Sequence, residues 1–175
     1  FLDTGDIREV DTYHRMGIIR GVTTNPTILR CAGVTGGMDG IKRRTIEIAK
    51  LVAPLPVSVE VLTNVRDEML AQAKEFAGWA ENMVVKVPIH GPEGELENVE
   101  VIHLLETQHD IRVNVTAMMS AQQCFLAVMA GATYVSLFGG RVNNMGYNCV
   151  DEIARLRMLL DRFELPGKII IGSTR

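Results

Sequence analysis

The chain has 175 residues, enough for one domain with a sizeable core. Hydrophobic residues make up 47% and charged residues 22%, which excludes a disordered chain and a membrane-embedded one. The net charge of -3 gives no electrostatic reason to expect nucleic acid or an anionic membrane as a partner. Neither a transmembrane-length apolar run nor a signal-like segment is present, and the three cysteines lack metal-like spacing. We therefore expect a cytoplasmic protein.

Short apolar runs rich in valine and isoleucine recur along the chain. Most show no polar alternation, which is the pattern of strands buried on both faces of a parallel sheet. The predicted strands are Phe1–Thr4, Gly21–Thr24, Val57–Val61, Met83–Pro88, Arg112–Thr116, Tyr134–Phe138 and Lys168–Ile171.

Amphipathic segments between these seven runs predict six helices, one between each strand and the next. Asn64 can cap a helix that extends through Ala77, and Ser120 and Gln123 have capping-box spacing at the head of another. Gly131 stands where a glycine commonly ends a helix. Apolar stripes place further helices around Ile41–Leu51, Val99–Leu105 and Val150–Leu160.

Strands that alternate with helices predict an α/β fold formed by a single domain over residues 1–175. Two architectures fit the pattern: an open doubly wound sheet, or a closed (β/α)8 barrel. A closed barrel would need an eighth strand after residue 171, so under that interpretation the chain lacks the last βα unit.

Polar residues stand at the end of nearly every predicted strand. In parallel α/β folds, functional groups gather at the ends where strands turn toward helices. The residues at those ends are Asp3, Thr23, Thr24, Asn25, Glu60, Lys86, Asn114, Thr116, Ser136, Arg141, Ser173 and Arg175.

Lys86 is the most informative of them, because it stands inside the otherwise apolar run Met83–Pro88. A lysine in an interior strand loses water from its ammonium, which favours the neutral amine that attacks carbonyl carbons. The alternative is a structural ion pair with Glu60 or Asp3, the two carboxylates found inside apolar strands. The two interpretations are compatible, since carboxylates beside such a lysine can also act as acid and base.

Two arginines follow predicted strands in the company of small residues. Arg141 comes after Phe138-Gly139-Gly140, and Arg175 comes after Gly172-Ser173-Thr174. Arginine with nearby hydroxyls or helix-start amides is typical of a phosphate or carboxylate site, so the pair favours anion binding.

Taken in order, these motifs resemble one family, the transaldolases together with the fructose-6-phosphate aldolases. The resemblance runs the length of the chain. The motifs that carry it are Phe1-Leu2-Asp3-Thr4, Gly21-Val22-Thr23-Thr24-Asn25-Pro26-Thr27, Val84-Val85-Lys86-Val87-Pro88, Asn114-Val115-Thr116, Ser136-Leu137-Phe138-Gly139-Gly140-Arg141 and Gly172-Ser173-Thr174-Arg175.

The resemblance implies a TIM-type barrel, and it implies roles for the strand-end residues. Lys86 would form an imine with a ketose phosphate, and Asp3 would take the proton of the donor hydroxyl. Glu60 and Thr116 would hold a water that shuttles protons. The protonated imine serves as the electron sink, so no cofactor and no metal are expected. Substrate hydroxyls and phosphate would be bound by Thr24, Asn25, Asn114, Ser136, Arg141, Ser173 and Arg175.

Within the resemblance, Glu60, Ser136 and Phe138 are similar to the transaldolases, whereas the fructose-6-phosphate aldolases carry Gln, Ala and Tyr at the matching places. We therefore expect transfer of a dihydroxyacetone unit between sugar phosphates in the pentose phosphate pathway, with aldolase-type cleavage as the alternative. Family members of this kind also imply a homo-oligomer. Other classes stay open: a non-catalytic barrel that binds sugar phosphates, an open-sheet nucleotide-binding domain without a glycine fingerprint, and a metal-dependent aldolase.

Overall fold

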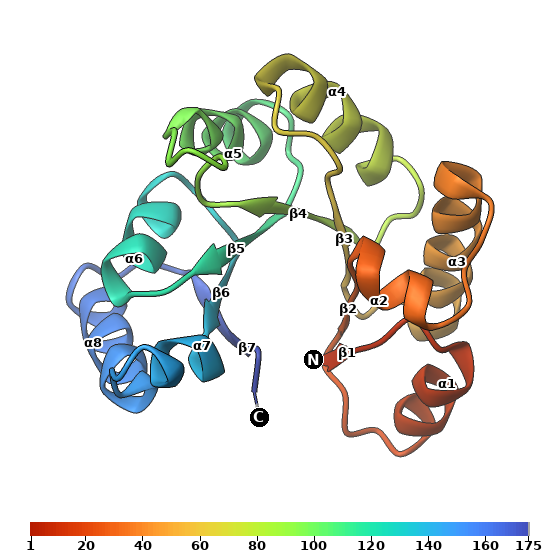
Figure 1. Ribbon diagram of the computed structural model, residues 1–175, viewed down its shortest axis with the longest axis horizontal. Helices are drawn as coiled ribbons and strands as arrows, with labels where there is room; N and C mark the ends of the chain where they lie inside the picture. The colour runs from red at the N-terminus through yellow and green to blue at the C-terminus, as the bar shows by residue number, and fades with distance from the viewer. Residues whose placement is uncertain (175) are drawn as a thin grey trace. The chain divides into compact units, whose positions relative to one another are not determined.

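A computed structural model describes residues 1–174 of the chain. Strands and helices alternate along it (Figure 1). The strands are β1 (Leu2–Asp3), β2 (Val22–Thr23), β3 (Val57–Glu60), β4 (Met83–Pro88), β5 (Val113–Met118), β6 (Tyr134–Phe138) and β7 (Lys168–Gly172). The helices are α1 (Ile7–Arg15), α2 (Pro26–Cys31), α3 (Gly37–Val52), α4 (Arg66–Ala77), α5 (Glu97–Gln108), α6 (Ala121–Met129), α7 (Gly139–Asn144) and α8 (Cys149–Arg162).

The strand order in the sheet is β1-β2-β3-β4-β5-β6-β7, the same as the order in the chain. The pairs β1–β2, β2–β3, β5–β6 and β6–β7 are parallel. A doubly wound sheet would reverse its order at a switch point, whereas a sheet built by sequential βα units keeps chain order. The predicted α/β fold of the TIM-barrel type is confirmed, with seven strands in the described residues against eight in a complete barrel.

The chain divides into two compact units, of which unit 1 contains residues 1–63 and 71–85 and unit 2 contains residues 64–70 and 86–175. In unit 1, α3 packs on β3 and on α1. The completely buried side chains of Val22, Ile48 and Val57 lie in its core. Helix α1 begins at a local signal, because the Asp6 side chain accepts a hydrogen bond from the Arg8 N–H at 2.8 Å.

In unit 2, α6 packs on β5, β6 and α8, and α7 packs on α8 and β7. The predicted cap of α6 is confirmed: Ser120 Oγ accepts from the Gln123 N–H at 3.2 Å. Gly131 follows the helix with a left-handed φ of 110°, as expected for a glycine beyond a helix end. Cys124 on α6 is completely buried, and this burial raises the pKa of its thiol to about 12.

The prediction of seven strands is confirmed, whereas the prediction of six helices is wrong by two. The additional helices, α2 and α7, each have six residues. Helix α7 directly follows β6, and α2 begins three residues after the last residue of β2. Neither is long enough to show a helical hydrophobic period, so the sequence pattern predicted no helix there. Both nevertheless carry expected functional residues at their beginnings, since Asn25 caps α2 and Arg141 is the third residue of α7. The prediction of a single domain over residues 1–175 stays a prediction.

Candidate active site

The carboxyl ends of β1 and β2 are joined by two side chains. Thr23 Oγ1 donates a hydrogen bond of 2.7 Å to Asp3 Oδ1, and the two residues are direct partners in the parallel register. Thr23 is buried whereas Asp3 is exposed. The hydroxyl therefore fixes one carboxylate oxygen of Asp3 and leaves the other directed elsewhere. The sequence predicts no role for Thr23 beyond its place at a strand end, and in the structure its hydroxyl positions the Asp3 carboxylate.

The next two residues of the chain bind backbone groups. Thr24 is fully buried, and its hydroxyl donates to the carbonyl of Ser58 on β3 at 2.9 Å. Asn25 caps α2, with its Oδ1 accepting from the Ile28 N–H at 2.8 Å and Pro26 at the first helical position. The cap uses the oxygen of the Asn25 amide, so the amide NH₂ is the part suited to a ligand.

Lys86 lies in the middle of β4, between the buried residues Val85 and Val87. The residue is only 8% exposed, although the ammonium group of lysine is strongly hydrated in water. Lysine is almost never this buried unless its ammonium has polar partners or a chemical role. The expected placement of Lys86 inside a buried strand is confirmed.

The β5–β6 pair of unit 2 carries a buried polar cluster. Asn114 is fully buried and Ser136 is 5% exposed, and Ser136 Oγ donates to Asn114 Oδ1 at 2.7 Å. Thr116 is two residues beyond Asn114 on the same strand and therefore faces the same side. Within the described residues, its buried Oγ1 has no hydrogen-bond partner. A buried hydroxyl of this kind is costly to keep unless it binds a water or a ligand.

A β-bulge follows Thr116. The register of β5 on β6 shifts between Val115, which pairs with Val135, and Met118, which pairs with Leu137. Three steps on β5 thus match two on β6, and Ala117 adopts a left-handed φ of 61°. Such strain is concentrated at functional sites in proteins, and the sequence holds no signal for it, since alanine is not a residue that favours this conformation.

Arg141 and Ser173 belong to adjoining segments of unit 2. The Gly140 N–H donates to the Ser173 carbonyl at 3.1 Å, which ties the start of α7 to the end of β7. The guanidinium carbon of Arg141 lies 4.8 Å from the centre of the Phe138 ring, a cation–π contact. Arg141 is exposed, and its guanidinium makes no hydrogen bond or ion pair within the part of the chain that the structure describes. Its donors can therefore all be used by an anion.

The structure thus joins Asp3 with Thr23, Asn114 with Ser136, and the segments of Arg141 and Ser173. Glu60 is half-buried at the end of β3. Arg175 lies outside the described residues. Ser173, like Ala117, has a left-handed φ, of 53°.

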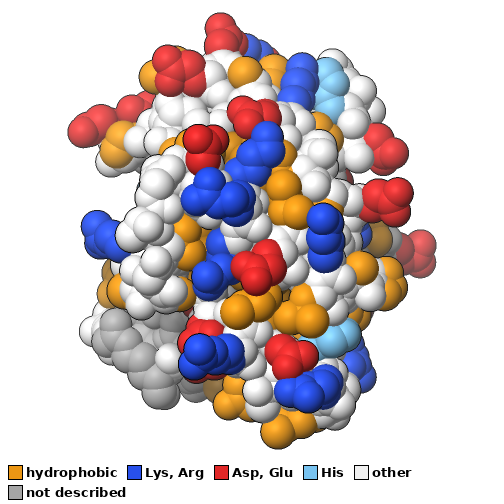
Figure 2. All heavy atoms as spheres, turned by 90° about the vertical axis from the view of Figure 1, so that its right-hand side faces the viewer, with side chains coloured by type: hydrophobic (Ala, Val, Ile, Leu, Met, Phe, Trp, Pro, Cys, Tyr) orange, Lys and Arg blue, Asp and Glu red, His pale blue; other side chains and the backbone are white. Residues whose placement is uncertain are grey.

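No group of three or more His, Cys, Asp or Glu among residues 1–174 is arranged to hold a metal ion. None of the helices described is long and apolar enough to cross a membrane. Figure 2 shows one face of the molecule, on which Lys and Arg side chains are interspersed with Asp and Glu. That face lacks the uniformly basic surface that nucleic acid binding favours.

Comparison with known proteins shows the family of the chain. The sequence profile described as "Transaldolase/Fructose-6-phosphate aldolase" matches residues 1–164. The chain belongs to this family. It is 37% identical over 177 residues to a "Probable transaldolase" of Lactiplantibacillus plantarum, covering 100% of this chain and 75% of that protein. It is 35% identical over 178 residues to a "Probable transaldolase" of Leptospira biflexa, covering 100% of this chain and 76% of that one.

Solved structures support the fold alone. A dihydrodipicolinate synthase family protein of Coccidioides immitis aligns with a TM-score of 0.65 at 15% identity, over 94% of this chain and 52% of that one. A lactate oxidase of Pediococcus acidilactici aligns with a TM-score of 0.57 at 14% identity, over 95% of this chain and 52% of that one. The chain of this transaldolase/aldolase family member therefore spans about half the length of these solved proteins.

Proposed function

We propose that the chain acts as a Schiff-base transaldolase, in which Lys86 is the nucleophile and sugar phosphates are the substrates. The observation that carries the proposal is a lysine 8% exposed inside a β-strand, in a chain of the transaldolase/fructose-6-phosphate aldolase family. Family membership supports an enzyme of aldolase or transaldolase type. The imine on Lys86 and the substrates are the proposal.

The first half of the proposed reaction forms and breaks bonds as follows. Nζ of Lys86 adds to the C2 carbonyl of a ketose phosphate, one proton is delivered through the water that Glu60 and Thr116 hold, and loss of water then gives a protonated imine. Asp3 then takes the proton of the C4 hydroxyl. The electron pair of the C3–C4 bond moves into the imine, which leaves an enamine of three carbons on Lys86 and releases an aldose phosphate.

The second half reverses these steps on a different aldehyde. The enamine carbon attacks the carbonyl carbon of an acceptor aldose phosphate, and Asp3 returns its proton to the new hydroxyl. Water then hydrolyses the imine, releasing a new ketose phosphate and the free amine of Lys86. We propose that Glu60 and Thr116 hold this water, and the unpartnered buried hydroxyl of Thr116 supports that role.

The remaining strand-end residues are proposed to bind the substrate. Hydroxyl groups of the sugar would be bound by Thr24, Asn25, Asn114 and Ser136, and the phosphate by Arg141, Ser173 and Arg175. The hydrogen bond of Thr24 to the Ser58 carbonyl suggests that it contributes mainly by placing Asn25. The exposed guanidinium of Arg141, stacked on Phe138, supports an anion-binding role.

The test is borohydride trapping of the full chain with fructose 6-phosphate, read by intact mass, with Lys86→Ala as the variant. Lys74→Ala is the matched control, because Lys74 lies exposed on α4. We expect a three-carbon adduct in the wild type and in Lys74→Ala, and none in Lys86→Ala. A folded wild-type chain that forms no adduct would instead be a non-catalytic sugar-phosphate-binding barrel.

Addition of erythrose 4-phosphate separates the two activities that the family name contains. A transaldolase passes the three-carbon unit to this acceptor, whereas an aldolase releases dihydroxyacetone and glyceraldehyde 3-phosphate without one. Glu60, Ser136 and Phe138 favour transfer. We further propose that the enzyme is a cytoplasmic homo-oligomer that works in the pentose phosphate pathway without a cofactor.

A further inference from the structure

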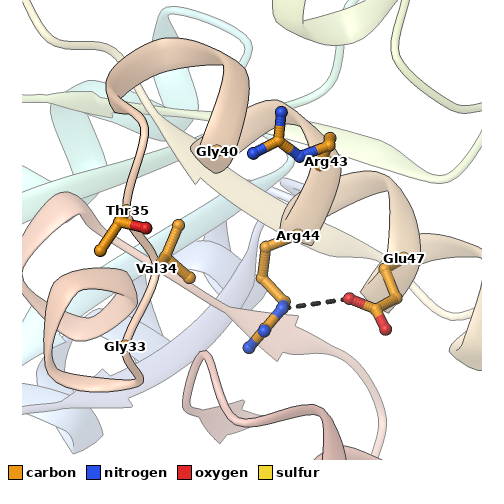
Figure 3. A pocket seen from close by; sticks show the side chains of 7 residues that line it. All are labelled: Gly33, Val34, Thr35, Gly40, Arg43, Arg44 and Glu47. Carbon is orange, nitrogen blue, oxygen red and sulfur yellow. Dashed lines mark hydrogen bonds and ion pairs between the residues drawn. The ribbon is translucent and has the colours of Figure 1, made fainter.

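Unit 1 contains a hollow that none of the strand-end residues lines. Its volume is about 320 Å³, and it lies between the loop that follows α2 and the first turns of α3. Figure 3 shows Gly33, Val34 and Thr35 on the loop side and Arg43, Arg44 and Glu47 on the helix side. The volume is at the lower end of the range for pockets that bind small molecules, about 300–1,000 Å³.

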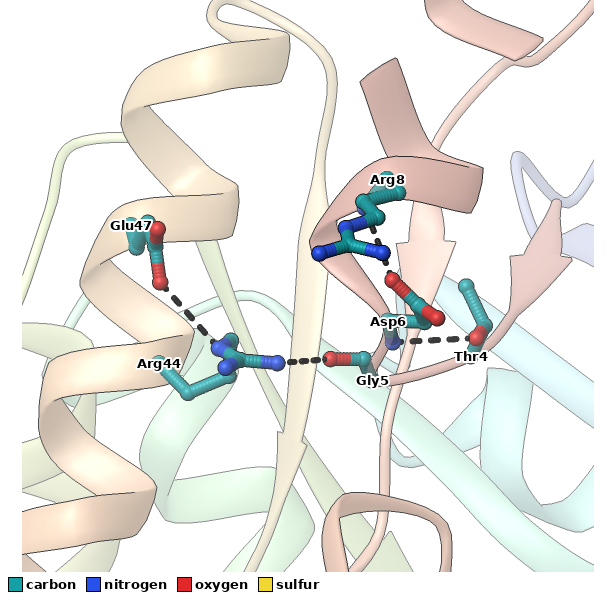
Figure 4. A network of polar contacts seen from close by, with 6 residues as sticks. All are labelled: Thr4, Gly5, Asp6, Arg8, Arg44 and Glu47. Carbon is teal, nitrogen blue, oxygen red and sulfur yellow. Dashed lines mark hydrogen bonds and ion pairs between the residues drawn. The ribbon is translucent and has the colours of Figure 1, made fainter. Parts of the chain in front are cut away.

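Arg44 is held in place by two contacts. Its Nη1 donates to the carbonyl of Gly5, after β1, at 2.6 Å, and its Nε donates to Glu47 Oε2 at 3.1 Å (Figure 4). These bonds fix the plane of the guanidinium. They leave its Nη2 amino group without a partner among residues 1–174, while Glu47 already has a cation beside it.

Arg43 differs from its neighbours on α3. Lys42 pairs with Glu75 at 3.9 Å and lies 5.7 Å from the centre of the Trp79 ring, and Arg44 is bound as described. The guanidinium of Arg43, in contrast, makes no hydrogen bond or ion pair with any described residue. It lines the hollow with all five of its N–H donors available.

The loop side offers further donors. Gly40 has no side chain, and a Cβ there would collide with the carbonyl of Thr35, so this glycine allows the loop to approach the helix closely. Gly33 and Gly36 take left-handed φ values of 78° and 88° on either side of Val34 and Thr35. The amide and the hydroxyl of Thr35 form no hydrogen bond within the described part of the chain.

We propose that this hollow binds the phosphate group of a small phosphorylated metabolite, between Arg43, Arg44 Nη2 and Thr35. Two guanidinium groups and a hydroxyl donate from different directions, which suits a tetrahedral oxyanion better than a planar carboxylate. The Gly5 carbonyl that accepts from Arg44 belongs to the residue two positions after Asp3, so Arg44 connects the hollow to the segment that carries Asp3. The proposal does not depend on the Schiff-base reaction.

The test is an NMR titration of the ¹⁵N-labelled full chain at constant ionic strength, with inorganic phosphate and then glycerol 3-phosphate as the probes. The Thr35 amide and the Arg43 Nε–H report binding in the hollow, which separates it from binding at Arg141. Arg43→Ala removes the free guanidinium. Arg30→Ala is the matched control, because Arg30 is an exposed arginine of the neighbouring helix α2 that does not line the hollow.

We expect the Thr35 amide signal to titrate in the wild type, with glycerol 3-phosphate binding at least as tightly as inorganic phosphate. Arg43→Ala should weaken the affinity about tenfold, as loss of a charge-assisted hydrogen bond does, and Arg30→Ala less than about twofold. The affinity of Arg43→Lys should lie between those of the wild type and Arg43→Ala, because lysine keeps the positive charge but lacks the planar set of donors of a guanidinium. No shift at Thr35, equal affinity in Arg43→Ala, or equal losses in Arg43→Ala and Arg30→Ala would each overturn the proposal.

Discussion

The two ends of the β5–β6 pair differ in how their polar groups are satisfied. At the amino end, Glu106 from α5 accepts hydrogen bonds from the N–H groups of Val113 and Thr133, both at 2.7 Å, and from the Thr133 hydroxyl at 3.1 Å. At the carboxyl end, Thr116 keeps a buried hydroxyl that bonds to none of residues 1–174, and Ala117 has a left-handed backbone.

This difference follows the division of labour in barrel folds, in which the amino ends of strands contribute stability and the carboxyl ends contribute chemistry. At the amino end, the single carboxylate of Glu106 accepts hydrogen bonds from N–H groups at the beginnings of both strands. The carboxyl end keeps strain and unmet bonding capacity, which cost stability and are retained where a ligand uses them. Substitutions at the two ends should therefore affect different properties.

The largest effect is expected for Lys86→Met, which keeps most of the aliphatic stem and removes the amine. Turnover of fructose 6-phosphate with erythrose 4-phosphate should fall at least about 10⁴-fold, since no other group can form the imine. The urea midpoint should change little, because methionine suits a buried strand. Steady-state kinetics and urea denaturation of the same preparation provide the measurement. A variant that is inactive only because it has unfolded would contradict the expected separation.

Glu106→Ala should have the opposite profile. The substitution leaves the Val113 and Thr133 N–H groups without their acceptor, and we expect a loss of about 3 kcal/mol in the free energy of unfolding. Molecules of the variant that are folded should have the same turnover number as the wild type. Glu106→Gln is the matched control, because its amide oxygen can still accept both N–H bonds, and it should lose less than about 1 kcal/mol. Equal losses in the two variants would show that the carboxylate charge, rather than the acceptor, matters.

The pH dependence of stability sharpens the same comparison. Burial raises the pKa of the Glu106 carboxyl, and the hydrogen bonds from Val113 and Thr133 oppose this only in part. The folded state therefore keeps the proton to a higher pH than the unfolded state, in which the pKa of glutamate is about 4.3. The contribution of this proton to stability is complete below that pH and is lost as the pH rises through the folded-state pKa.

Glutamine at position 106 does not titrate, so the pH-dependent part belongs to the difference between the wild type and Glu106→Gln. The free energy of unfolding of the wild type should decline relative to the variant as the pH rises above about 4.3, and the difference should become constant at higher pH. Urea denaturation of both proteins at half-unit pH steps measures it. A difference that grows in favour of the wild type with pH would show that the hydrogen bonds outweigh burial.

Part of the fold and of the candidate site could be predicted from the sequence. The apolar strands and the polar residues at their ends were predictable because burial and period are local properties of sequence. Asn25 was predicted as a strand-end residue, but its place directly before Pro26 is also a local capping signal, and its Oδ1 accepts a hydrogen bond from the Ile28 N–H. Lys86 stood out because a charge inside an apolar run is rare.

Other features depend on contacts between distant segments, for which a single sequence has no signal. The hydrogen bond between Thr23 and Asp3 joins residues 20 positions apart in the sequence, and the hydrogen bond between Thr133 and Glu106 joins residues 27 positions apart. The bulge at Ala117 arises from the register of β5 on β6, and nothing in the residues around it marks the position. The short helices α2 and α7 were missed because six residues are too few to show a helical hydrophobic period.

The smallest effect is expected at Ala117. Glycine adopts a left-handed φ of 61° without the steric cost that alanine meets, but it also gains freedom in the unfolded chain. These terms oppose each other, so Ala117→Gly should raise the free energy of unfolding by no more than about 1 kcal/mol. Ala117→Val should lower the free energy of unfolding by more than about 1 kcal/mol, because a β-branched residue at this φ is a marked outlier.

The turnover of Ala117→Gly then shows whether the strained backbone at Ala117 serves catalysis. If the strain at Ala117 serves to place Thr116, Ala117→Gly should reduce turnover severalfold while the protein becomes slightly more stable, the trade expected at a functional site. Asp110 has a similar φ of 53° at the amino end of β5 and is the matched control. Asp110→Gly should bring the same small gain in stability with no change in turnover. Equal kinetic effects of the two glycines would mean that backbone strain has no special role at the carboxyl end.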